Sequence, residues 1–480
     1  MIVLKQLLLD LQYDTRGELP NSIREIKNNS LEVMQGDLFV ALVGEQFDAH
    51  DFAESAAKMG AAAIVVERFL PLNIPQIKVK NTKSALACLA DRYYESPTKK
   101  MKLAGITGTN GKTTVVYLLK KIFKTAGFNY GTVGTLGYDI NGEEFNTSLT
   151  TPDSLKLQQI FAAMVARGVT HGAMEVSSHA IDLHRVDAID FDGVAFTNLT
   201  QDHLDYHKTM ANYGRTKAKL FDKTRGFKIA NIDGEFAGFF LEKENVMTAS
   251  ISKSADFRWQ EDVLYKNGIR GTIETPAGCI QIKSALTGNF NLQNILTAVA
   301  VAVKMGIDNK AIEKTLQTVD FIPGRLQEVR NPAGIRIFID YAHTPDAIEN
   351  VLQSLRDLVP ENRRLVSLFG CGGNRDKTKR PKMAAAAEKY SDYCILTSDN
   401  PRFEDPIEII NDAKGGFSGD IPVTIFKNRK EAIEFVLDTI EEGDIFAILG
   451  KGHENYIDIK GLRLPFSEEQ IIMDYYENNL

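Results

Sequence analysis

Residues 103–114 read Leu103-Ala-Gly-Ile-Thr-Gly-Thr-Asn-Gly-Lys-Thr-Thr114 and join an apolar strand to a glycine loop that opens a helix. Gly108 and Gly111 lack side chains, so backbone N–H groups there can close on phosphate oxygens, and the start of a helix expected at about 113–126 favours an anion. Lys112 is expected to reach the outer phosphates of a nucleotide, and the Thr113 hydroxyl suits Mg²⁺, which prefers hard oxygen ligands. The stretch therefore predicts a triphosphate site.

The spacing departs from the generic phosphate loop, which has a glycine where this chain has Ile106. A short glycine loop is also compatible with a plain strand-to-helix turn whose lysine is solvated. A lysine followed by two threonines after an apolar strand favours the phosphate interpretation. The loop residues expected to bind the nucleotide are Gly108, Thr109, Asn110, Gly111, Lys112, Thr113 and Thr114.

Length and composition predict a soluble protein with several domains. A chain of 480 residues is too long for one ordinary core, and at roughly 100–200 residues per domain it suggests about three domains. The hydrophobic fraction of 44% and the charged fraction of 25% are typical of globular proteins. A net charge of −7 argues against a nucleic-acid partner, which would require a basic face.

Cysteine usage and apolar segments predict a cytoplasmic protein without a membrane segment, and we expect a monomer. The 4 cysteines are scattered, with no metal-type pairs and no sign of a disulfide framework. Residues 1–10 lack the pattern of a signal peptide. The most apolar helical run, at 295–305, is shorter than the about 20 residues that span a bilayer.

The alternation of expected strands and helices predicts an α/β protein of three domains. These are a small N-terminal domain at 1–98, a central domain with a mostly parallel, phosphate-loop type of sheet at 99–322, and a Rossmann-like domain at 323–480 that lacks a dinucleotide fingerprint. Residues 96–100, which combine a proline with a charge run, are expected to form the linker out of the first domain.

Short apolar runs bounded by turn residues predict the strands. In the first domain they lie at 36–42 and 61–66, on either side of a helix at 52–60. Further runs of this kind lie at 172–176, 193–198, 227–232, 336–340, 365–369, 393–397 and 445–449. Residues 246–288 are also β-rich, but their strand order does not follow from the sequence.

Polar residues follow the central strands at the point where each strand ends. The carboxyl ends of parallel strands form the ligand crevice of an open α/β sheet, so these residues are expected to face the same ligand as Lys112. A strand-end glutamate is often only a helix cap or a surface charge. Beside a phosphate loop, however, it becomes a candidate magnesium ligand. The residues in question are Glu175, Ser177, Asn198 and Thr200.

The loop at 197–207, Thr197-Asn-Leu-Thr-Gln-Asp-His-Leu-Asp-Tyr-His207, contains two histidines and two aspartates. We reject a zinc site, because no cysteine accompanies them and the histidine spacing lacks the glutamate base of a metalloprotease. His203 as a ligand of Mg²⁺ or Mn²⁺ is chemically possible, although imidazole is unusual for these ions. Histidines that only hydrogen-bond a tight loop are the alternative.

Four stretches together resemble the central domain of the Mur ligases: 107–114, 175–179, 197–207 and a tyrosine-to-lysine run at 206–221. In that family the lysine that matches Lys217 is carbamylated. A carbamate turns the cation into a two-oxygen anion that can hold a metal ion. The resemblance otherwise extends over nearly the whole chain.

The resemblance implies an ATP site with two Mg²⁺ ions. The implied metal ligands are Thr113, Glu175, His203 and Lys217, and the implied catalytic residues are Lys112, Lys217 and His203. From the residues alone, Lys217 and Lys219 are two lysines of one polar helix, distinguished only by their spacing to the neighbouring tyrosines. Three further nucleotide contacts are implied at Asn294, Arg325 and Asp340.

The resemblance also implies that the chain binds UDP-N-acetylmuramoyl-L-alanyl-D-glutamate. The matching positions for this substrate in the central domain are Thr150, Thr151, Ser177, Arg185 and Lys217. A guanidinium at Arg185 suits a carboxylate or a pyrophosphate, because it forms charge-assisted hydrogen bonds with either. In the N-terminal domain Ser30 matches the uridine-binding region, but Leu31 stands where an arginine is expected.

Three charged, glycine-rich loops follow strands of the last domain, and the resemblance implies that they bind the incoming amino acid. Arg402 of Asp399-Asn-Pro-Arg402 can pair with the distal carboxylate of meso-2,6-diaminopimelate, which lysine lacks. The near end is expected to meet Arg375 and Asn400, and an ammonium group is expected at Glu454 and the Gly450 backbone. The implied set is Arg375, Asp399, Asn400, Pro401, Arg402, Gly450 and Glu454.

The sequence thus leads us to expect a ligase that uses ATP to join diaminopimelate to the muramoyl dipeptide through an acyl phosphate, in the synthesis of a peptidoglycan precursor. Closure of the domains would bring the reactants together and exclude water. The alternatives are a ligase of the same family that adds L-lysine, a ligase resembling folylpolyglutamate synthetase, and a nucleotide-binding module without catalysis.

Overall fold

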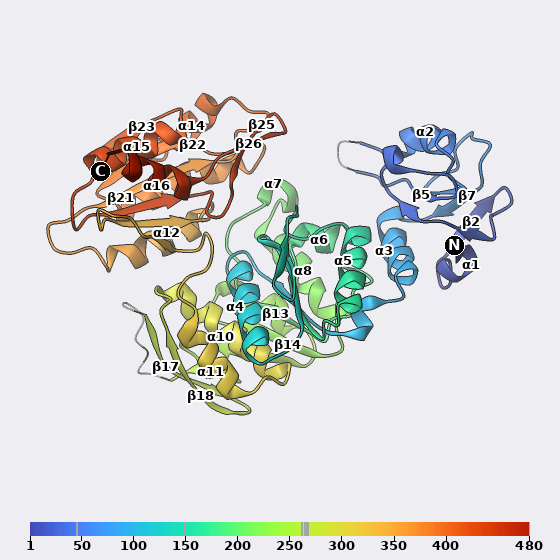
Figure 1. Cartoon of the computed structure of the whole chain (residues 1–480), viewed down its shortest axis with the longest axis horizontal. Helices are drawn as coiled ribbons and strands as arrows, with labels where there is room; N and C mark the ends of the chain where they lie inside the picture. The colour runs from blue at the N-terminus through green and yellow to red at the C-terminus, as the bar shows by residue number, and fades with distance from the viewer. Residues whose placement is uncertain (45–46, 148, 261–262, 264–267, 480) are drawn as a thin grey trace. The chain divides into compact units, whose positions relative to one another are not determined.

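The computed structural model describes residues 1–44, 47–147, 149–260, 263 and 268–479. It is a mixed α/β protein in which helices alternate with parallel and antiparallel strands (Figure 1). The chain forms two compact units. The first comprises Met1–Thr107, Gly127–Val194 and Thr216–Lys228, and the second comprises Gly108–Ala126, Ala195–Arg215 and Ile229–Leu480. The three domain boundaries expected from the sequence stay a prediction.

The N-terminal part of the first unit is a five-stranded sheet in the order β2-β7-β6-β5-β4. Its strands are β2 (Tyr13–Arg16), β7 (Gln76–Val79), β6 (Ala63–Val66), β5 (Leu38–Val40) and β4 (Ile26–Lys27). Alternate residues of β6 point to opposite faces: Ala63 and Val65 pack with α1 (Leu4–Leu7) and α3 (Thr82–Tyr93), whereas Ile64 and Val66 pack with α2 (Ala53–Lys58). The small α/β unit expected here is therefore present.

Two local expectations for this region are only partly right. The helix expected at 52–60 begins with a 3₁₀ turn at Ala49–Phe52, because the side chain of Asp48 accepts a hydrogen bond from the His50 amide, and α2 follows it. The expected linker at 96–100 is instead a 3₁₀ helix, Pro97–Lys100, whose first two residues are buried. The Thr98 hydroxyl accepts a hydrogen bond from the Asp190 amide at 3.1 Å, so the segment packs against the body of the unit.

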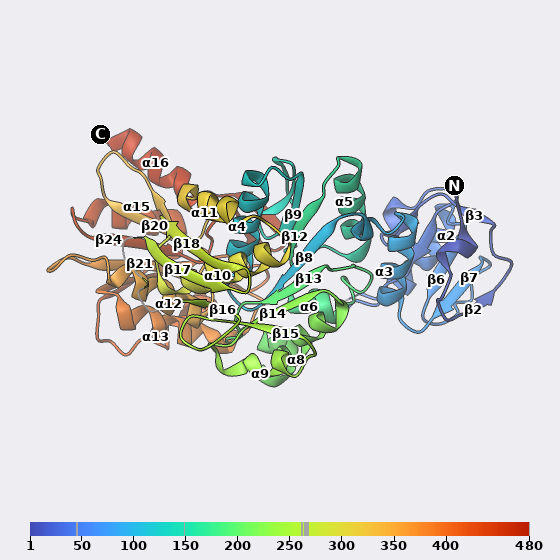
Figure 2. The same cartoon turned by 90° about the horizontal axis from the view of Figure 1, so that it is seen from below.

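The first unit also contains the parallel strands that lead into the glycine loop. In β12 (His171–Glu175) the residues pair in parallel with β8 (Lys102–Thr107) on one side and with β9 (Tyr130–Gly134) on the other. Figure 2 shows these three strands side by side. Two antiparallel strands, β10 (Gly137–Ile140) and β11 (Glu143–Phe145), extend this arrangement beyond β9. The strand expected at 172–176 is confirmed within one residue.

The second unit contains the helix after the glycine loop, α4 (Lys112–Thr125), which packs with α10 (Asn289–Lys304) and α11 (Asn309–Thr318). The β-rich stretch at 246–288 forms β15 (Val246–Ser250), β16 (Phe257–Trp259), β17 (Ile269–Thr275) and β18 (Gly278–Ser284). The first pair is parallel and the other two are antiparallel, so the strand order that the sequence left open is β15-β16-β17-β18. Residues 261–262 and 264–267 of this stretch lie outside the described residues.

The C-terminal part of the second unit is a six-stranded sheet in the order β19-β20-β24-β21-β22-β23. Its strands are β19 (Gln327–Val329), β20 (Arg336–Asp340), β24 (Ile445–Leu449), β21 (Leu365–Cys371), β22 (Tyr393–Ser398) and β23 (Val423–Ile425). All neighbours from β20 to β23 pair in parallel, and β19 is antiparallel at one edge. The four strands expected in this region are confirmed.

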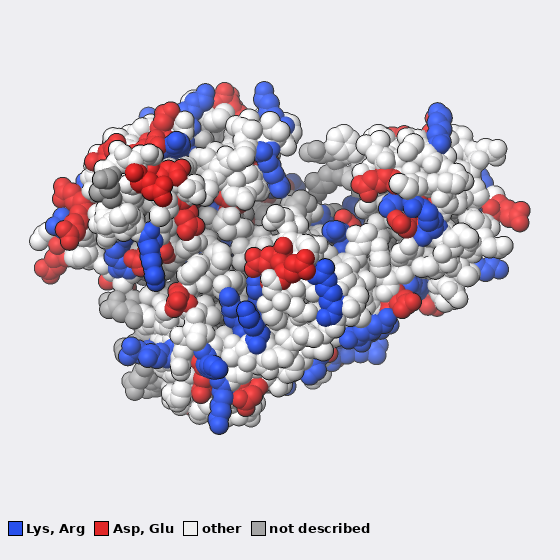
Figure 3. Space-filling view, in the orientation of Figure 1, with Lys and Arg blue, Asp and Glu red and all other residues white. Residues whose placement is uncertain are grey.

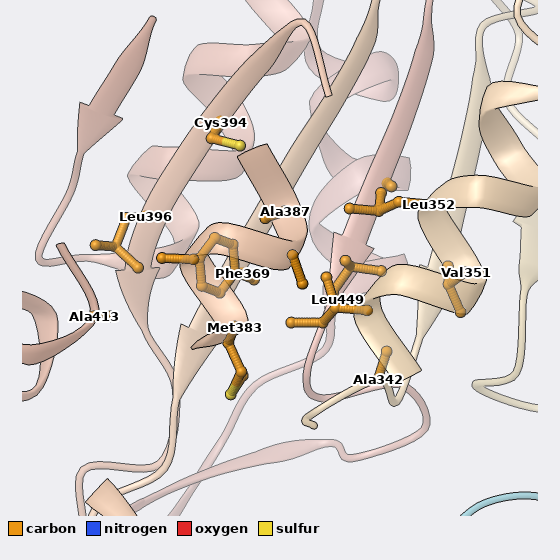
Figure 4. Close-up of a cluster of buried hydrophobic side chains, with 14 of the residues drawn as sticks. Ala342, Val351, Leu352, Phe369, Met383, Ala387, Cys394, Leu396, Ala413 and Leu449 are labelled. Carbon is orange, nitrogen blue, oxygen red and sulfur yellow. The ribbon is translucent and has the colours of Figure 1, made fainter. Parts of the chain in front are cut away.

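Helices cover both faces of this sheet, as in a doubly wound fold. Leu365 and Phe369 of β21 pack with α12 (Pro345–Arg356), α13 (Arg380–Tyr390) and α14 (Pro406–Lys414) in the cluster of Figure 4. Val366 and Leu368, which alternate with them, pack with α15 (Arg429–Thr439) and α16 (Glu468–Asn479) on the other face. The period-two alternation of apolar residues thus builds two separate cores on one sheet.

The surface carries both signs of charge. On the face drawn in Figure 3, Lys and Arg side chains alternate with Asp and Glu side chains over short distances. The apolar run at 295–305 belongs largely to α10, where every residue from Asn294 to Ala302 is buried. Across the described part of the chain, no helix has the length and hydropathy that crossing a membrane requires.

Phe369→Ala is expected to lower the free energy of unfolding by about 3–5 kcal/mol, because it leaves a cavity among closely packed side chains. Phe403→Ala is the control, since this phenylalanine is 72% exposed and its loss should cost less than about 0.5 kcal/mol. Urea denaturation followed by circular dichroism compares the two variants. Equal losses would contradict a core position for Phe369.

Candidate active site

The glycine loop needs its two glycines because other side chains approach it closely. A Cβ atom on Gly108 would lie 1.9 Å from Thr197 Oγ1, and one on Gly111 would lie 2.2 Å from Asn294 Oδ1. Gly111 also has a φ of +85°, in the left-handed region that glycine tolerates best. It is the N-cap of α4, so the first turn of that helix opens directly onto the loop.

The conformation of the loop is fixed by hydrogen bonds within the second unit. Lys112 Nζ donates to the carbonyl oxygens of Gly108 and Thr109, each at 2.9 Å. The Asn110 amide donates to Asn198 Oδ1 at 2.9 Å, and Thr109 Oγ1 donates to the Thr200 carbonyl at 3.2 Å. The expectation that Asn198 and Thr200 lie near the lysine loop is therefore met.

A pocket of about 270 Å³ lies beside the loop in the second unit. It brings together six of the ten residues expected to bind a nucleotide, namely Asn110, Gly111, Thr114, Asn294, Arg325 and Asp340. The other four, Gly108, Thr109, Lys112 and Thr113, belong to the loop without lining the pocket. Phe290 and Val351 add apolar surface to the wall, so the pocket offers both an apolar side and polar groups.

Arg325 and Asp340 form the side of this pocket that comes from the last part of the chain. Arg325 Nη2 donates to Thr113 Oγ1 at 3.0 Å, and the guanidinium lies 4.7 Å above the ring of Tyr341. Its buried Nε has no hydrogen-bond partner among the described residues. Asp340 accepts the Leu326 amide at 2.6 Å, which holds the arginine loop against β20. A cation with spare donors on a pocket wall suits a phosphate group.

His203 stands next to a buried aspartate in the same unit. Its Nε2 lies 3.3 Å from Asp202 Oδ2, and Lys379 Nζ donates to Asp202 Oδ1 at 3.3 Å. Burial by itself raises the pKa of Asp202, but Lys379, His203 and His343 lower it by more, so the net pKa lies below the ordinary value. The aspartate therefore carries a negative charge beside the Lys379 ammonium and the imidazoles of His203 and His343.

In the first unit, the residues expected to bind the dipeptide are joined by hydrogen bonds. Thr151 Oγ1 donates to the Glu175 carbonyl at 2.9 Å and accepts the Ser177 amide at 3.1 Å, while Arg185 Nη1 donates to the Thr151 carbonyl at 2.8 Å. Thr150 Oγ1 lies 3.1 Å from Thr135 Oγ1. Sequence positions 150, 151, 177 and 185 thus form one cluster around the end of β12.

The carboxylate of Glu175 belongs to this cluster. Its Oε1 accepts the Thr135 amide at 2.8 Å, and its Oε2 accepts the Thr135 hydroxyl at 3.1 Å. A Cβ atom on Gly134 would come within 2.4 Å of Oε1, so the glycine leaves the space that the carboxylate occupies. Glu175 is therefore a positioned side chain and not a surface charge, with 1% of its area exposed.

Burial distinguishes the two lysines of α8 (Met210–Ala218) and the turn after it. Lys217 is 1% exposed. Lys219 is largely exposed, and its Nζ lies 3.5 Å from Asp182 Oδ1 in a surface ion pair. Burying an ammonium group is costly. Lys217 is therefore the buried one of the two lysines, and its modification and metal binding stay predictions.

The loops expected to bind the amino acid all follow strands of the six-stranded sheet. Because β22, β21 and β24 are parallel neighbours, their carboxyl ends meet at one edge. The loops at 372–379, 399–402 and 450–454 consequently lie side by side. Contacts between them include the Gly373 amide, which donates to the Asn400 carbonyl at 2.9 Å, and Asn400 Nδ2, which donates to Glu454 Oε2 at 2.8 Å.

Two arginines are close together in these loops. Burial, and then the positive charge of Arg402, lower the pKa of Arg375 below its ordinary value. Arg402 Nη1 donates to the Gly373 carbonyl at 2.7 Å, and a Cβ on Gly372 would lie 3.0 Å from the same Nη1. Two neighbouring guanidinium groups at a ligand edge favour an anion between them.

The backbone of Arg402 is held by a β-hairpin. Arg402 has a φ of +52°, which is unusual for a residue other than glycine. Its amide donates to the Asp458 carbonyl at 3.0 Å, and its carbonyl accepts the Lys460 amide at 2.7 Å. These partners belong to the hairpin of β25 (Tyr456–Ile459) and β26 (Leu462–Pro465). Unusual backbone geometry at a ligand site is typical of functional residues.

Ser30 stands apart from the other expected site residues. It begins a 3₁₀ turn, Ser30–Glu32, in the N-terminal sheet region and is 9% exposed. Leu31, which occupies the position of the expected arginine, is 80% exposed. The described contacts do not connect Ser30 to a pocket, so its role in binding uridine stays a prediction.

Several charged residues of the site were not singled out by the sequence. Asp346 accepts a hydrogen bond from Asn110 Nδ2 at 2.9 Å across 236 positions of the chain. Lys379 meets Asp202, and Lys451 meets three side chains of the amino-acid loops. Lys451 lies between Gly450 and Glu454, which were both expected in the site, so its position was an available signal. Asp346 and Lys379 also follow strands that the sequence predicts, but nothing in the sequence shows which distant residue each of them contacts.

The donors available for a metal ion fit magnesium better than zinc. Within the described residues, no group of three or more His, Cys, Asp or Glu side chains is arranged to hold a metal. The expected set contributes a hydroxyl, a carboxylate, an imidazole and a carbamate, in which oxygen predominates. Mg²⁺ typically takes few protein ligands and completes its shell with phosphate oxygens and water. The residues therefore fit Mg²⁺ that arrives with a nucleotide.

Comparison with protein families assigns three segments of the chain. Residues 22–94 match the Mur ligase family catalytic domain, residues 106–302 match the Mur ligase middle domain, and residues 324–452 match the Mur ligase glutamate ligase domain. Each matched segment lies inside one of the three domains expected from the sequence.

Individual proteins resemble the chain over almost its full length. UDP-N-acetylmuramoyl-L-alanyl-D-glutamate--2,6-diaminopimelate ligase of Bacillus licheniformis is 40% identical over 465 residues, which cover 95% of each chain. A solved structure of a ligase of that name is 32% identical, covers 95% of each chain and has a TM-score of 0.67. Folylpolyglutamate synthase of Mycobacterium tuberculosis, solved with ADP and AMPPCP, covers only 76% of this chain at 19% identity, with a TM-score of 0.64, and shares the fold.

Gly111→Ala is expected to weaken ATP binding by at least about tenfold, or about 1.4 kcal/mol. The new methyl group would lie 2.2 Å from Asn294 Oδ1 and displace that side chain from the pocket. Gly306→Ala is a matched control, because its φ of +84° gives the same backbone strain while no described atom lies within 4 Å of the new methyl. Titration with a fluorescent ATP analogue compares the two, and equal affinities would contradict the expectation.

Proposed function

Since this chain belongs to the Mur ligase family, we propose that it attaches meso-2,6-diaminopimelate to UDP-N-acetylmuramoyl-L-alanyl-D-glutamate, with ATP as the phosphoryl donor. Members of this family are ATP-dependent ligases that form amide bonds, and this chain is such a ligase. The product is a peptidoglycan precursor. ATP and UDP-linked sugars are cytoplasmic metabolites, so the proposal puts the reaction in the cytoplasm.

The observation that carries the choice of amino acid is the pair of guanidinium groups at Arg375 and Arg402. Diaminopimelate has a carboxylate at each end, whereas lysine has only one. Arg402 can form a bidentate pair with the distal carboxylate, and Arg375 is close enough to it for each charge to affect the other. Resemblance to diaminopimelate ligases over the whole chain supports the same choice.

The reaction takes place in two chemical steps. An oxygen of the free D-glutamyl carboxylate attacks the γ-phosphorus of ATP, the bond from that phosphorus to ADP breaks, and an acyl phosphate forms. The amine of diaminopimelate then attacks the carbonyl carbon, the bond to the phosphate oxygen breaks, and phosphate leaves as the amine loses a proton. No side-chain nucleophile is needed, so the protein acts through position and charge.

The loop residues supply the charge for the first step. Lys112 is proposed to leave the carbonyl oxygens of Gly108 and Thr109 and to bind the outer phosphates of ATP, where it stabilises the negative charge that develops on the transferred group. Arg325 approaches the same pocket and has an unused buried Nε. Asn294 and Asp340, which line the pocket, are proposed to bind the rest of the nucleotide.

Two Mg²⁺ ions are part of the proposal. Thr113 and Glu175 would hold one, and His203 with carbamylated Lys217 would hold the other; bound there, the ions would neutralise charge on the phosphates. Lys217 is buried, and the family resemblance, in which the matching lysine is carbamylated, is what supports its conversion to a carbamate.

The remaining expected residues are proposed to bind the two organic substrates. Around the end of β12, the cluster of Thr150, Thr151, Ser177 and Arg185 would receive the muramoyl dipeptide, and Ser30 would contact its uridine part. Arg375 and Asn400 would hold the near end of diaminopimelate, Glu454 and the Gly450 backbone would receive an ammonium group, and Asp399 and Pro401 would complete the loop beside them. We expect the protein to act as a monomer.

The proposal predicts that phosphate release from ATP requires both the muramoyl dipeptide and diaminopimelate, with L-lysine a poor substitute. Arg402→Ala should lower kcat/KM for diaminopimelate by about 30-fold or more, the size expected on losing a bidentate charge pair. It should leave kcat/KM for lysine within about threefold, because the distal carboxylate is absent there.

Arg463→Ala is the control for charge alone, because this arginine lies on the adjacent β26 and stacks on Tyr456, with no proposed substrate contact. Equal use of both amino acids by the unmodified protein would retain the ligase and refute the selector role of Arg402. Release of phosphate with a folate and glutamate instead would favour a folylpolyglutamate synthetase, and no release under any condition would favour a nucleotide-binding module.

A further inference from the structure

Lys451 is a fully buried lysine at the edge where the amino-acid loops meet. It follows β24, and its side chain is 0% exposed. The proposed reaction assigns it no role. An ammonium group is removed from water at a large cost unless each of its protons finds an acceptor. The hydrogen-bond acceptors around Lys451 are therefore the side chains whose positions depend on it.

The three protons of Lys451 have three side-chain acceptors. Nζ lies 3.4 Å from Asp399 Oδ1, 3.1 Å from Asn400 Oδ1 and 3.2 Å from Glu454 Oε2. An ammonium has three donors and no acceptor, so its capacity is used in full. All three partners are residues proposed to bind the amino acid, and they come from two different loops.

This arrangement fixes the orientation of Asn400. Its Oδ1 faces Lys451 and also accepts the Asp458 amide at 2.9 Å. Its Nδ2 must then face the other way, where it donates to Glu454 Oε2 at 2.8 Å. A flipped amide would place a donor against the ammonium, which is electrostatically unfavourable.

The same contacts leave one oxygen of Glu454 with spare capacity to accept a hydrogen bond. Oε2 accepts from both Lys451 and Asn400. Oε1 has a longer contact, 3.3 Å from the hydroxyl of Tyr341. A carboxylate oxygen can accept two hydrogen bonds, so Oε1 retains the capacity to accept one from a ligand ammonium.

We propose that Lys451 is a positioning residue for the diamino acid: it holds Asp399, Asn400 and Glu454 in the one arrangement that accepts the ammonium group of the substrate. This inference rests on the proposed function. Lys451 does not touch the substrate in this account. It sets the charge and the direction of the groups that do.

Electrostatics support this role. Burial by itself raises the pKa of Asp399, but Lys451, followed by Arg429 and Arg402, lowers it by more, so the carboxyl stays ionised. Without Lys451, two carboxylates and an amide would remain buried around an empty position. The pKa of Asp399 would then be higher, and a carboxyl that binds a proton more readily is a weaker acceptor for an ammonium.

A purely structural role for Lys451 is the competing explanation, and Arg429 provides the comparison. Arg429 is also fully buried and lies behind the same strand ends. It pairs with Glu468 and donates to the Leu449 carbonyl at 2.8 Å. It hydrogen-bonds none of the three acceptors of Lys451 in the described structure, and among them it shares with Lys451 only the electrostatic effect on Asp399. A substitution there creates a comparable buried defect without releasing the substrate-facing side chains.

The test is a comparison of Lys451→Met and Arg429→Met by steady-state phosphate release. Lys451→Met should raise the KM for diaminopimelate by about 30-fold, as expected when charge-assisted hydrogen bonds lose their geometry, and should leave the KM for ATP within about twofold. Arg429→Met should lower the melting temperature and leave the KM for diaminopimelate within about threefold.

Equal rises of the KM in both variants, or a fall in kcat alone after Lys451→Met, would overturn the proposal. If Lys451→Met does not fold, as judged by binding of an ATP analogue, Lys451→Gln replaces it, because glutamine retains a donor of similar reach. If neither variant binds nucleotide, Lys451 supports the fold and the proposal is wrong. Failure of the unmodified protein to release phosphate would instead refute the proposed function.

Discussion

The parallel pairing of β24, β21 and β22 is the constraint on which the proposed amino-acid site depends. Side-by-side parallel strands end at the same edge, so three loops far apart in sequence are forced to share one small volume. The charged residues of these loops are therefore brought into contact with one another. Each buried charged group needs an ion-pair or hydrogen-bond partner, and this requirement fixes the arrangement of the side chains. The proposed substrate would therefore bind to a hydrogen-bonded network that forms without it.

The same constraint explains why buried ions occur here and not in the cores. The two apolar clusters on the faces of the sheet contain almost entirely aliphatic and aromatic side chains. Lys451 and Arg429 lie instead at the strand ends, where backbone carbonyls and carboxylates are available as partners. A buried ion pair stabilises a protein little compared with apolar packing, but it fixes the direction of its members. Direction is what a binding site requires.

The local features of the fold were predictable from the sequence, and the long-range contacts were not. The glycine loop could be predicted because all of its residues are neighbours in the sequence. Strand β20 matches the expected 336–340 because a short apolar run is a local signal for a strand. Residues 97–100 form a packed 3₁₀ turn that the sequence did not predict, since a proline and a charge run look alike in an extended linker and in such a turn.

The candidate site shows the same division. Arg375, Asn400 and Glu454 were expected at strand ends, and the structure brings their loops together. Lys451 was overlooked, because a sequence shows residue types in a loop but not which of them point inward. Lys217 and Lys219 differ by two positions, so they lie on different sides of the helical turn, and only packing shows which side is buried.

The hairpin of β25 and β26 gives the selector loop a property that its sequence does not suggest. The backbone amide and carbonyl of Arg402 form hydrogen bonds with residues 458 and 460, so Arg402 pairs with the hairpin as a third strand would. The direction of its guanidinium therefore depends on a segment more than fifty positions downstream. Transplanting the tetrapeptide Asp399-Asn-Pro-Arg402 into another protein would therefore transfer the sequence of the proposed selector without its geometry. To keep the geometry, the loop would have to be transferred together with its hairpin.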